Sequence, residues 1–121
     1  MQKRLGVADK EWIKQRLKKY TERDITCNEP HFTNKLDLQN IDKNEVIHHI
    51  LNPEKLAFVG ASESKNRKYR LVYDLYFQTG KNRTLKIPAS LKSQSLYLIS
   101  VIKIKRKVQH EARKYYGQKE L

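Results

Sequence analysis

Two neighbouring segments alternate apolar and polar side chains, and this period-two pattern constrains the fold more than any other feature of the chain. The first segment places apolar side chains at every second position from 69 to 77, and the second does so from 85 to 91. Alternation of this kind is typical of half-buried β-strands. Residues 79–82 (TGKN) lie between the two segments and have turn composition. The pattern predicts two strands joined by a turn.

Two further segments have the composition of strands. Residues 56–59 form a short apolar run, and residues 96–104 form a longer one that we expect to lie near the centre of the sheet. Pro88 interrupts the strand at 85–91 and indicates a sheet edge or a bulge, because proline donates no hydrogen bond. We therefore predict a four-stranded, mostly antiparallel sheet.

The clearest helix signal lies just before these strands. Asp42 is a good N-cap with Glu45 three residues on, which makes a capping box, and Ile41 and Val46 make a hydrophobic staple. A helix over 43–51 follows, and it ends near Pro53 because proline restricts the residue before it. Residues 31–36 suggest another helical turn, which gives a pair of helices across 31–51.

Both ends of the chain also predict helix. At the N-terminus, Asp9 caps a helix over 9–23, whose apolar stripe consists of Trp12, Ile13, Leu17 and Tyr20. At the C-terminus, a short helix over about 107–116 would end at Gly117. The predicted protein is one α+β domain over 1–121, in which N-terminal helices pack on the sheet. It has a basic N-terminal helix in 1–23, a core over 31–105 and a basic C-terminal helix or tail over 106–121.

The charge is strongly positive and unevenly distributed. The chain has 26 Lys and Arg against 13 Asp and Glu, a net charge of +13, and residues 1–23 and 103–121 each carry a surplus of +5. A basic balance of this size favours a polyanionic partner, because the partner's counterions are released on binding. We expect a nucleic acid, with RNA favoured, contacted by Lys14, Lys18, Arg67, Arg83, Lys103, Lys105, Arg106 and Lys107.

Other functional classes lack their signals. A metal site needs about four ligands, but the four histidines form no H-x-x-x-H pair and Cys27 is the only cysteine. The four glycines are too scattered for a phosphate-binding loop, so we expect no cofactor. One cysteine permits no intrachain disulfide, and no apolar run approaches the ~20 residues that cross a bilayer. These observations predict a cytoplasmic protein without a membrane partner.

One stretch of the sequence gives more specific information than the composition does. The run His31-Phe32-Thr33-Asn34-Lys35-Leu36-Asp37-Leu38-Gln39-Asn40-Ile41-Asp42, followed by Val46, Ile50, Pro53 and strands, resembles the opening of a family of small uncharacterised domains. That family is grouped with the ribonuclease-toxin fold shared by barnase, EndoU, colicin nucleases and RelE, the BECR fold. The resemblance covers residues 31–105. His31 matches the family's histidine and Lys35 its first basic position, whereas Gln39 and Asn40 replace an arginine and a glycine.

The resemblance implies a metal-independent ribonuclease of the toxin-antitoxin type, with an acidic antitoxin-like protein as a possible partner. In such a reaction the 2′-hydroxyl of RNA is the nucleophile, so the protein supplies a base, an acid and cations. The candidate catalytic residues are His31, Lys35, Arg70 and Tyr73, with Arg83 beside them as a phosphate ligand. Tyr73 fits stacking on a base as well as core packing.

Two other functions remain open on the sequence. The first is a non-catalytic RNA- or ribosome-binding module that uses the basic segments 9–23 and 103–119. The second is an adaptor whose basic ends dock an acidic protein. Turnover of RNA distinguishes the enzyme from both of these alternatives.

Overall fold

The structure is a computed structural model that describes residues 3–63, 71–106 and 108–116. Over these residues the protein is α+β, as predicted, with four α-helices and one seven-stranded sheet. The elements in chain order are β1 (Lys3–Val7), α1 (Lys10–Lys18), η1 (Glu22–Asp24), β2 (Ile25–Cys27), α2 (His31–Gln39), α3 (Lys43–Leu51), η2 (Pro53–Lys55), β3 (Leu56–Glu63), β4 (Leu71–Gly80), β5 (Arg83–Leu91), β6 (Leu96–Leu98), β7 (Ile102–Ile104) and α4 (Val108–Tyr116).

The sheet is mostly antiparallel, but it is larger than the four strands that the sequence predicts. The strand order is β1-β3-β4-β5-β6-β2, and β7 pairs with β5 beyond the end of β6. All neighbours run antiparallel except β2 and β6, which are parallel. The additional strands β1 and β2 have five and three residues, too few to show a clear alternation.

The predicted last strand is in fact two strands, and Pro88 lies opposite the interruption. β6 pairs with the end of β5, β7 pairs with its beginning, and residues 99–101 separate them. The Ile99 amide donates to the Pro88 carbonyl oxygen at 2.9 Å, so the nitrogen of Pro88 also faces this interruption. The missing N–H therefore costs the sheet no ladder bond, and Pro88 lies in an inner strand rather than at the expected edge.

The N-terminal segment is not the single helix predicted over 9–23 within the basic residues 1–23. Residues 3–7 form β1, which pairs with β3 through a bulge at Gly6, where φ is 132°. α1 follows its N-cap Asp9, whose carboxylate accepts a 3.1 Å hydrogen bond from the Trp12 amide, and it ends at Lys18. Because Ile13 and Leu17 of α1 are fully buried in the core, this basic segment is an integral part of the domain.

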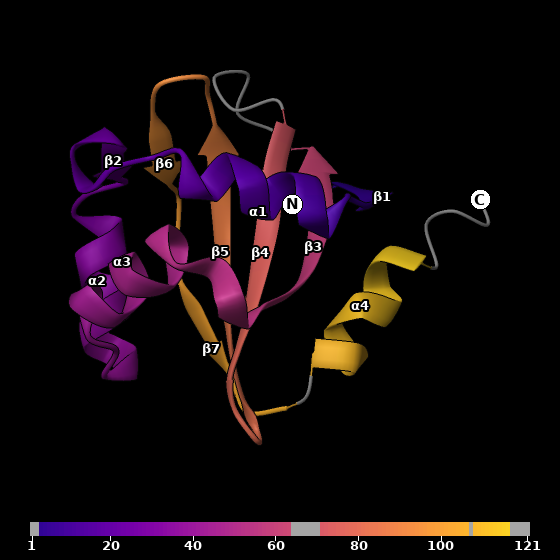
Figure 1. The fold of residues 1–121 in the computed structure, drawn as a ribbon. Coiled ribbons are helices and arrows are strands. Elements are labelled where there is room, and N and C mark those ends of the chain that lie inside the picture. Colours follow the sequence, from indigo (N-terminus) through magenta and orange to yellow (C-terminus); the bar gives the residue numbers. More distant parts are fainter. Residues whose placement is uncertain (1–2, 64–70, 107, 117–121) are drawn as a thin grey trace.

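Helices cover both faces of the sheet. α1, α2 and α3 pack on one face, while α4 lies at the β1 side of the sheet, away from α2 and α3 (Figure 1). Along β4, Leu75 and Phe77 point into the main core, whereas Tyr76 points to the other face and meets Tyr115 of α4 and Phe58 of β3. The protein therefore has one large core and a smaller aromatic cluster under α4.

The aromatic cluster under α4 also contains buried polar groups. The Asp74 carboxylate is fully buried and its Oδ2 accepts hydrogen bonds from the Ser62 and Tyr115 hydroxyls, each at 2.7 Å. Its Oδ1 has no hydrogen-bond partner among the described residues. The aromatic ring of Tyr115 lies directly against Gly60, and a Cβ at position 60 would come within 2.2 Å of it. α4 can dock only because residue 60 is glycine.

Candidate nucleic-acid interface

Most of the positive charge that the structure describes is not neutralised by carboxylates. Within residues 3–63, 71–106 and 108–116, ion pairs of 4.0 Å or less involve Arg83, Arg106 and Lys114 among the lysines and arginines. Apart from Lys3, whose side chain lies outside the description, the remaining described lysines and arginines have no described carboxylate within that distance. Much of the excess charge expected from composition is therefore carried by cations that have no carboxylate partner among the described residues.

Two of the predicted catalytic residues share one side of α2. His31 and Lys35 are four residues apart, which places them one above the other on a helix. The helix start is fixed by Glu29, whose carboxylate accepts hydrogen bonds from the amide and the hydroxyl of Thr33 at 2.8 and 2.6 Å. These bonds from Thr33 lower the pKa of Glu29, so that carboxylate is charged at neutral pH.

His31 lies over the interruption between β6 and β7. Its imidazole is exposed, and its Nε2 is 3.2 Å from the Oγ of the half-buried Ser100. Lys35, one turn further along α2, is half-buried. The structure thus brings His31, Lys35 and Ser100 to one side of α2, where an imidazole is open to solvent beside a lysine.

Gln39, one turn beyond Lys35, ties α2 to β7. Its Nε2 donates to the carbonyl oxygens of Lys35 and Val101, both at 2.9 Å, and its Oε1 accepts from the Lys103 amide at 2.8 Å. The Lys103 ammonium group donates to the Gln39 carbonyl oxygen at the end of α2 at 2.7 Å. Gln39 is therefore a structural residue, and Lys103 is partly occupied by the same contact.

Tyr73, another of the predicted catalytic residues, does not join His31. Tyr73 pairs across the sheet with Ala89, which in turn pairs with Leu98 of β6. Tyr73 is therefore two strands away from β6, a total distance of about 10 Å. Its ring instead lies 6.5 Å from that of Trp12, centre to centre, beside α1. Tyr73 is half-buried and packs against the main core. Arg70 lies outside the described residues, as do Arg67 and Lys107 of the predicted binding set.

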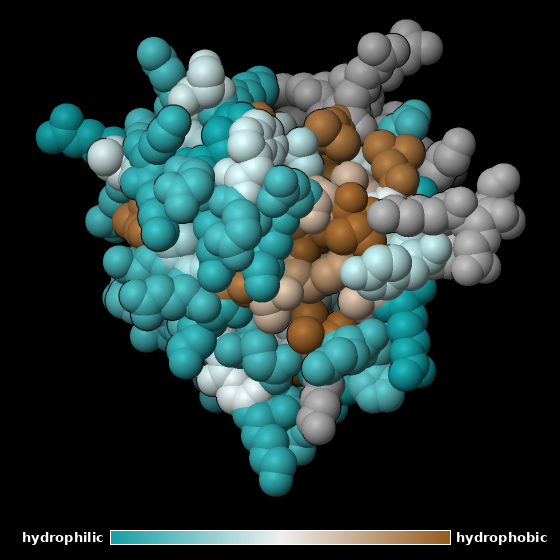
Figure 2. Space-filling model, turned by 45° about the vertical axis from the view of Figure 1, so that its right-hand side comes forward, coloured by the Kyte–Doolittle hydropathy of each residue, from teal (hydrophilic) through white to brown (hydrophobic). Residues whose placement is uncertain are grey.

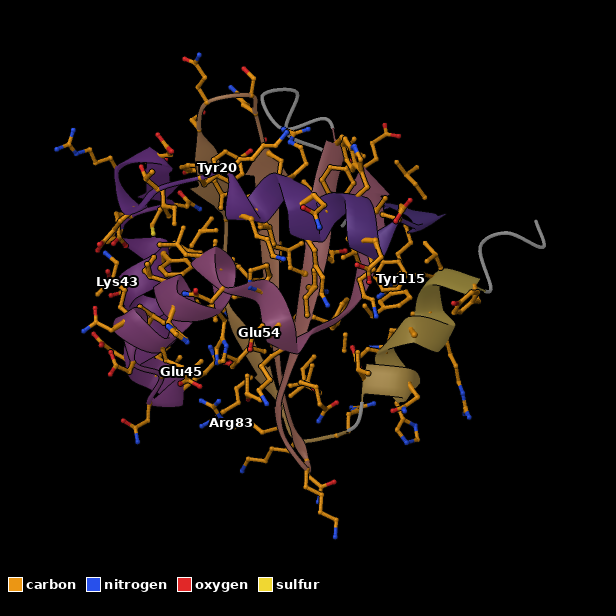
Figure 3. All side chains as sticks on the ribbon, viewed as in Figure 1. Tyr20, Lys43, Glu45, Glu54, Arg83 and Tyr115 are labelled. Carbon is orange, nitrogen blue, oxygen red and sulfur yellow. The ribbon has the colours of Figure 1, made fainter. Side chains whose placement is uncertain are left out.

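Arg83 is held by a carboxylate rather than free for phosphate. Its Nη1 and Nη2 contact Oε2 and Oε1 of Glu45 at 2.6 and 3.0 Å, and Nη1 also donates to the Thr79 hydroxyl at 2.7 Å. Figure 3 shows Arg83 below Glu45, with Lys43 higher on the same helix. At the start of α3, Asp42 accepts from the Asn44 amide as an N-cap. The Glu45 carboxylate is directed to Arg83 and does not complete the predicted capping box.

The Glu45–Arg83 pair has a third member that sequence reasoning did not identify. The Nε2 of His49 is 3.6 Å from Oε2 of Glu45, and its ring stacks on Phe77 with centres 5.9 Å apart. Burial lowers the pKa of His49, and the neighbouring Glu45 only partly opposes this effect. The i,i+4 spacing of Glu45 and His49 was visible in the sequence, but Arg83 and Phe77 join them only through the fold.

The remaining predicted binding residues lie in two separate places. Lys18 is exposed and Lys14 half-buried on α1, whereas Lys105 and Arg106 are exposed after β7. Nη1 of Arg106 is 3.6 Å from a carboxylate oxygen of the buried Glu111 in α4. Because α1 and α4 pack on opposite faces of the sheet, the described parts of the two basic ends do not form a single face.

A cleft of about 500 Å³ lies beside β2, but its chemistry does not indicate a metal centre. Its lining includes Cys27, Glu29 and Lys43. Burial raises the pKa of the Cys27 thiol, which keeps it protonated at neutral pH. Among the residues that the structure describes, no three His, Cys, Asp or Glu side chains gather as metal ligands would.

Comparisons with known protein families, curated proteins and solved structures give no match to this chain. The helices in the described part of the chain are all too short or too polar to cross a membrane.

Proposed function

We propose that this protein binds RNA through its free surface cations. The observation that supports the proposal is the net charge of +13 together with the scarcity of carboxylates near the described lysines and arginines. Phosphate groups release condensed counterions when they meet such cations, so binding weakens as the salt concentration rises. Lys14 and Lys18 on α1 and Lys105 after β7 are the contacts that we retain from the sequence.

The test is a titration of a fluorescently labelled single-stranded RNA at several salt concentrations. We expect the logarithm of the binding constant to fall linearly with the logarithm of the salt concentration, with a slope near −0.7 for each phosphate neutralised. The variant Lys14→Gln/Lys18→Gln should lower both the affinity and the magnitude of the slope. Its matched control is Lys55→Gln/Lys81→Gln, which removes the same charge from exposed residues of η2 and of the β4–β5 turn. The absence of binding at low salt would refute the proposal.

A second candidate function is RNA cleavage at His31, and the contact of this exposed imidazole with Ser100 beside Lys35 favours it. In this reaction His31 takes the proton of a 2′-hydroxyl, whose oxygen forms a bond to phosphorus while the bond to the 5′-oxygen breaks. The departing 5′-oxygen takes a proton from solvent water, and His31 then returns its proton to the solvent. The products are a 2′,3′-cyclic phosphate and a 5′-hydroxyl. Lys35 would offset the negative charge that develops on the phosphate.

Cleavage is tested with purified protein and total RNA in the presence of EDTA. We expect His31→Ala to abolish cleavage, while His110→Ala, which alters an exposed histidine of α4, should leave it intact. Equal rates for wild type and His31→Ala would remove His31 from the reaction. Binding without any cleavage by the wild type would leave the protein as a binding module.

A further inference from the structure

Trp12 is placed differently from what its sequence suggests. The predicted apolar stripe of α1 puts Trp12 in the core with Ile13 and Leu17, but 47% of its surface is exposed, whereas those two residues are fully buried. Other large apolar side chains, including Leu5 of β1 and Leu71 of β4, are exposed as well. Figure 2 turns forward the side of the molecule on which β1 lies in Figure 1, and it shows a patch of apolar surface there. Trp12 is therefore an indole at the surface of a strongly basic protein.

Cations accompany Trp12 along the same side of α1. Arg16 and Lys19 follow it by four and seven residues, which places the three side chains along one side of the helix over about 10 Å. The Arg16 guanidinium carbon lies 5.1 Å from the centre of the indole ring. The guanidinium is held in place by the Lys92 carbonyl oxygen at 3.2 Å and by the Tyr20 hydroxyl at 3.4 Å. We call Trp12, Arg16 and Lys19 the aromatic–basic strip.

We propose that the aromatic–basic strip binds single-stranded RNA, with an unpaired base stacked on Trp12 and neighbouring phosphates on Arg16 and Lys19. This inference rests on the proposed function and adds a site and a class of RNA to it. An aromatic ring beside cations is the arrangement with which proteins bind single strands, because stacking takes the base and the cations follow the backbone. A duplex does not expose the faces of its bases, so we expect the strip to discriminate against it.

The cations distinguish this occupant from an apolar protein surface. Arg16 and Lys19 have no ion-pair partner among the described carboxylates, and burying them against an apolar partner would leave two charges without compensation. An RNA strand supplies both a flat apolar surface and phosphate groups. Tyr73, whose ring centre is 6.5 Å from that of Trp12, extends the aromatic surface beneath α1.

Trp12 is the only tryptophan of the chain, so its fluorescence reports on this site alone. A single-stranded oligonucleotide should quench the emission in parallel with complex formation in a mobility shift on the same samples. Inorganic polyphosphate, a polyanion without bases, should bind through charge and leave the emission unchanged. The same oligonucleotide annealed into a duplex should cause much less quenching at equal occupancy.

Affinity provides the second measurement. Trp12→Leu keeps an apolar side chain but removes the ring, and it should weaken single-strand binding by roughly 5- to 150-fold, the effect expected for the loss of one stacked base. Trp12→Phe should retain most of the affinity. The matched control is Leu38→Ala, which alters an exposed apolar residue on a different helix, α2, and should leave the affinity for single-stranded RNA unchanged. Circular dichroism and thermal unfolding confirm that each variant is folded.

The outcomes separate this inference from the proposed function. A mobility shift without quenching, or equal affinity of wild type and Trp12→Leu, would overturn the role of Trp12 while RNA binding stands. No shift with any RNA would overturn both proposals. If ultracentrifugation shows a dimer that Trp12→Leu converts to a monomer, with unchanged RNA affinity, the strip is an interface between two copies and the inference is also wrong.

Discussion

Glu45 and Arg83 form a two-point ion pair that joins the first turn of α3 to the start of β5. The two distances, 2.6 Å from Nη1 to Oε2 and 3.0 Å from Nη2 to Oε1, are those of parallel charge-assisted hydrogen bonds. Roughly a third of each side chain remains exposed, so water screens the attraction. The pair links the helical layer to the sheet, and it occupies an arginine that we expected to bind phosphate.

Replacing Glu45 with glutamine should reduce the free energy of unfolding modestly. After screening by water is allowed for, we expect a loss of about 0.5 to 1 kcal/mol, measured by urea denaturation at neutral pH. Glu54→Gln is the matched control, since Glu54 is exposed and has no ion pair with a described residue. An equal loss in both variants would mean that net charge, rather than the pair, sets the effect.

The same pair predicts a dependence on pH with a definite sign. Hydrogen bonds from Arg83 lower the pKa of Glu45 below its ordinary 4.5 in the folded protein. The contribution of the pair is therefore complete above pH 4.5 and is lost as the pH falls through the lowered pKa. Denaturation curves at several pH values should show the stability difference between wild type and Glu45→Gln shrinking below pH 4.5. A difference that stays constant would contradict this assignment.

Gly60→Ala should loosen α4. The added methyl group would lie 2.2 Å from Cε1 of Tyr115 and 2.5 Å from Cδ1 and Cζ, so the ring must move. We expect a loss of about 1 to 3 kcal/mol, which is typical of overpacking, and faster proteolysis within residues 108–116. Tyr115→Ala alone should cost about 3 to 5 kcal/mol, because it deletes a fully buried aromatic side chain.

The double variant tests the cause of that effect. With Tyr115→Ala already present, Gly60→Ala should cost almost nothing, so the two changes should be strongly non-additive. Additive losses would show that position 60 needs glycine for a reason other than the ring of Tyr115.

Alkaline pH should destabilise the cluster under α4. Burial raises the pKa values of Tyr76 and Tyr115 far above the ordinary 10.0, and the negative charge of Asp74 adds to both shifts. Groups with raised pKa values contribute stability that is complete below pH 10 and is lost as the pH rises further. Tyrosinate absorbance should therefore appear for these two residues only on unfolding. In Asp74→Asn the pKa values of both tyrosines should fall, and an unchanged titration would contradict the role of the carboxylate.

The structure agrees with the sequence where the signal is local. The predicted helix over 43–51 has the bounds of α3, because the cap at Asp42 and the stop at Pro53 lie next to the helix itself. The strands predicted over 69–77 and 85–91 correspond to β4 and β5, because alternation is repeated at every residue pair. The structure extends both strands into the predicted turn, to Gly80 and from Arg83, and residues 69–70 lie outside its description. Short strands such as β2, with three residues, have no such repetition and exist only through their neighbours.

The candidate site depends on contacts that no local pattern contains. Glu45 and Arg83 are 38 residues apart, and His31 and Ser100 are 69 apart. Trp12 matches the apolar spacing of α1, yet the sheet beneath α1 buries Ile13 and Leu17 and leaves the indole at the boundary. Side-chain type identified the cations, but only the fold shows which of them are free.

Gln39→Arg should destabilise the junction between α2 and β7. Glutamine supplies both a donor and an acceptor there, and arginine has no acceptor, so the Lys103 amide would lose its 2.8 Å partner. Leaving this half-buried N–H without a partner costs about 1 to 3 kcal/mol. Thermal and urea unfolding measure the loss, and amide hydrogen exchange at Lys103 locates it.

Asn34→Arg is the matched control for this change, because it places the same side chain on α2 at an exposed position. It should leave stability nearly unchanged. RNA affinity is compared for the same two variants. If positions 34 and 39 are both only surface contacts, the added arginine should strengthen RNA binding by a similar factor in Asn34→Arg and in Gln39→Arg. If Gln39→Arg were as stable as Asn34→Arg, the hydrogen bonds of Gln39 would not hold α2 against β7, and the placement of His31 beside Ser100 would need another cause.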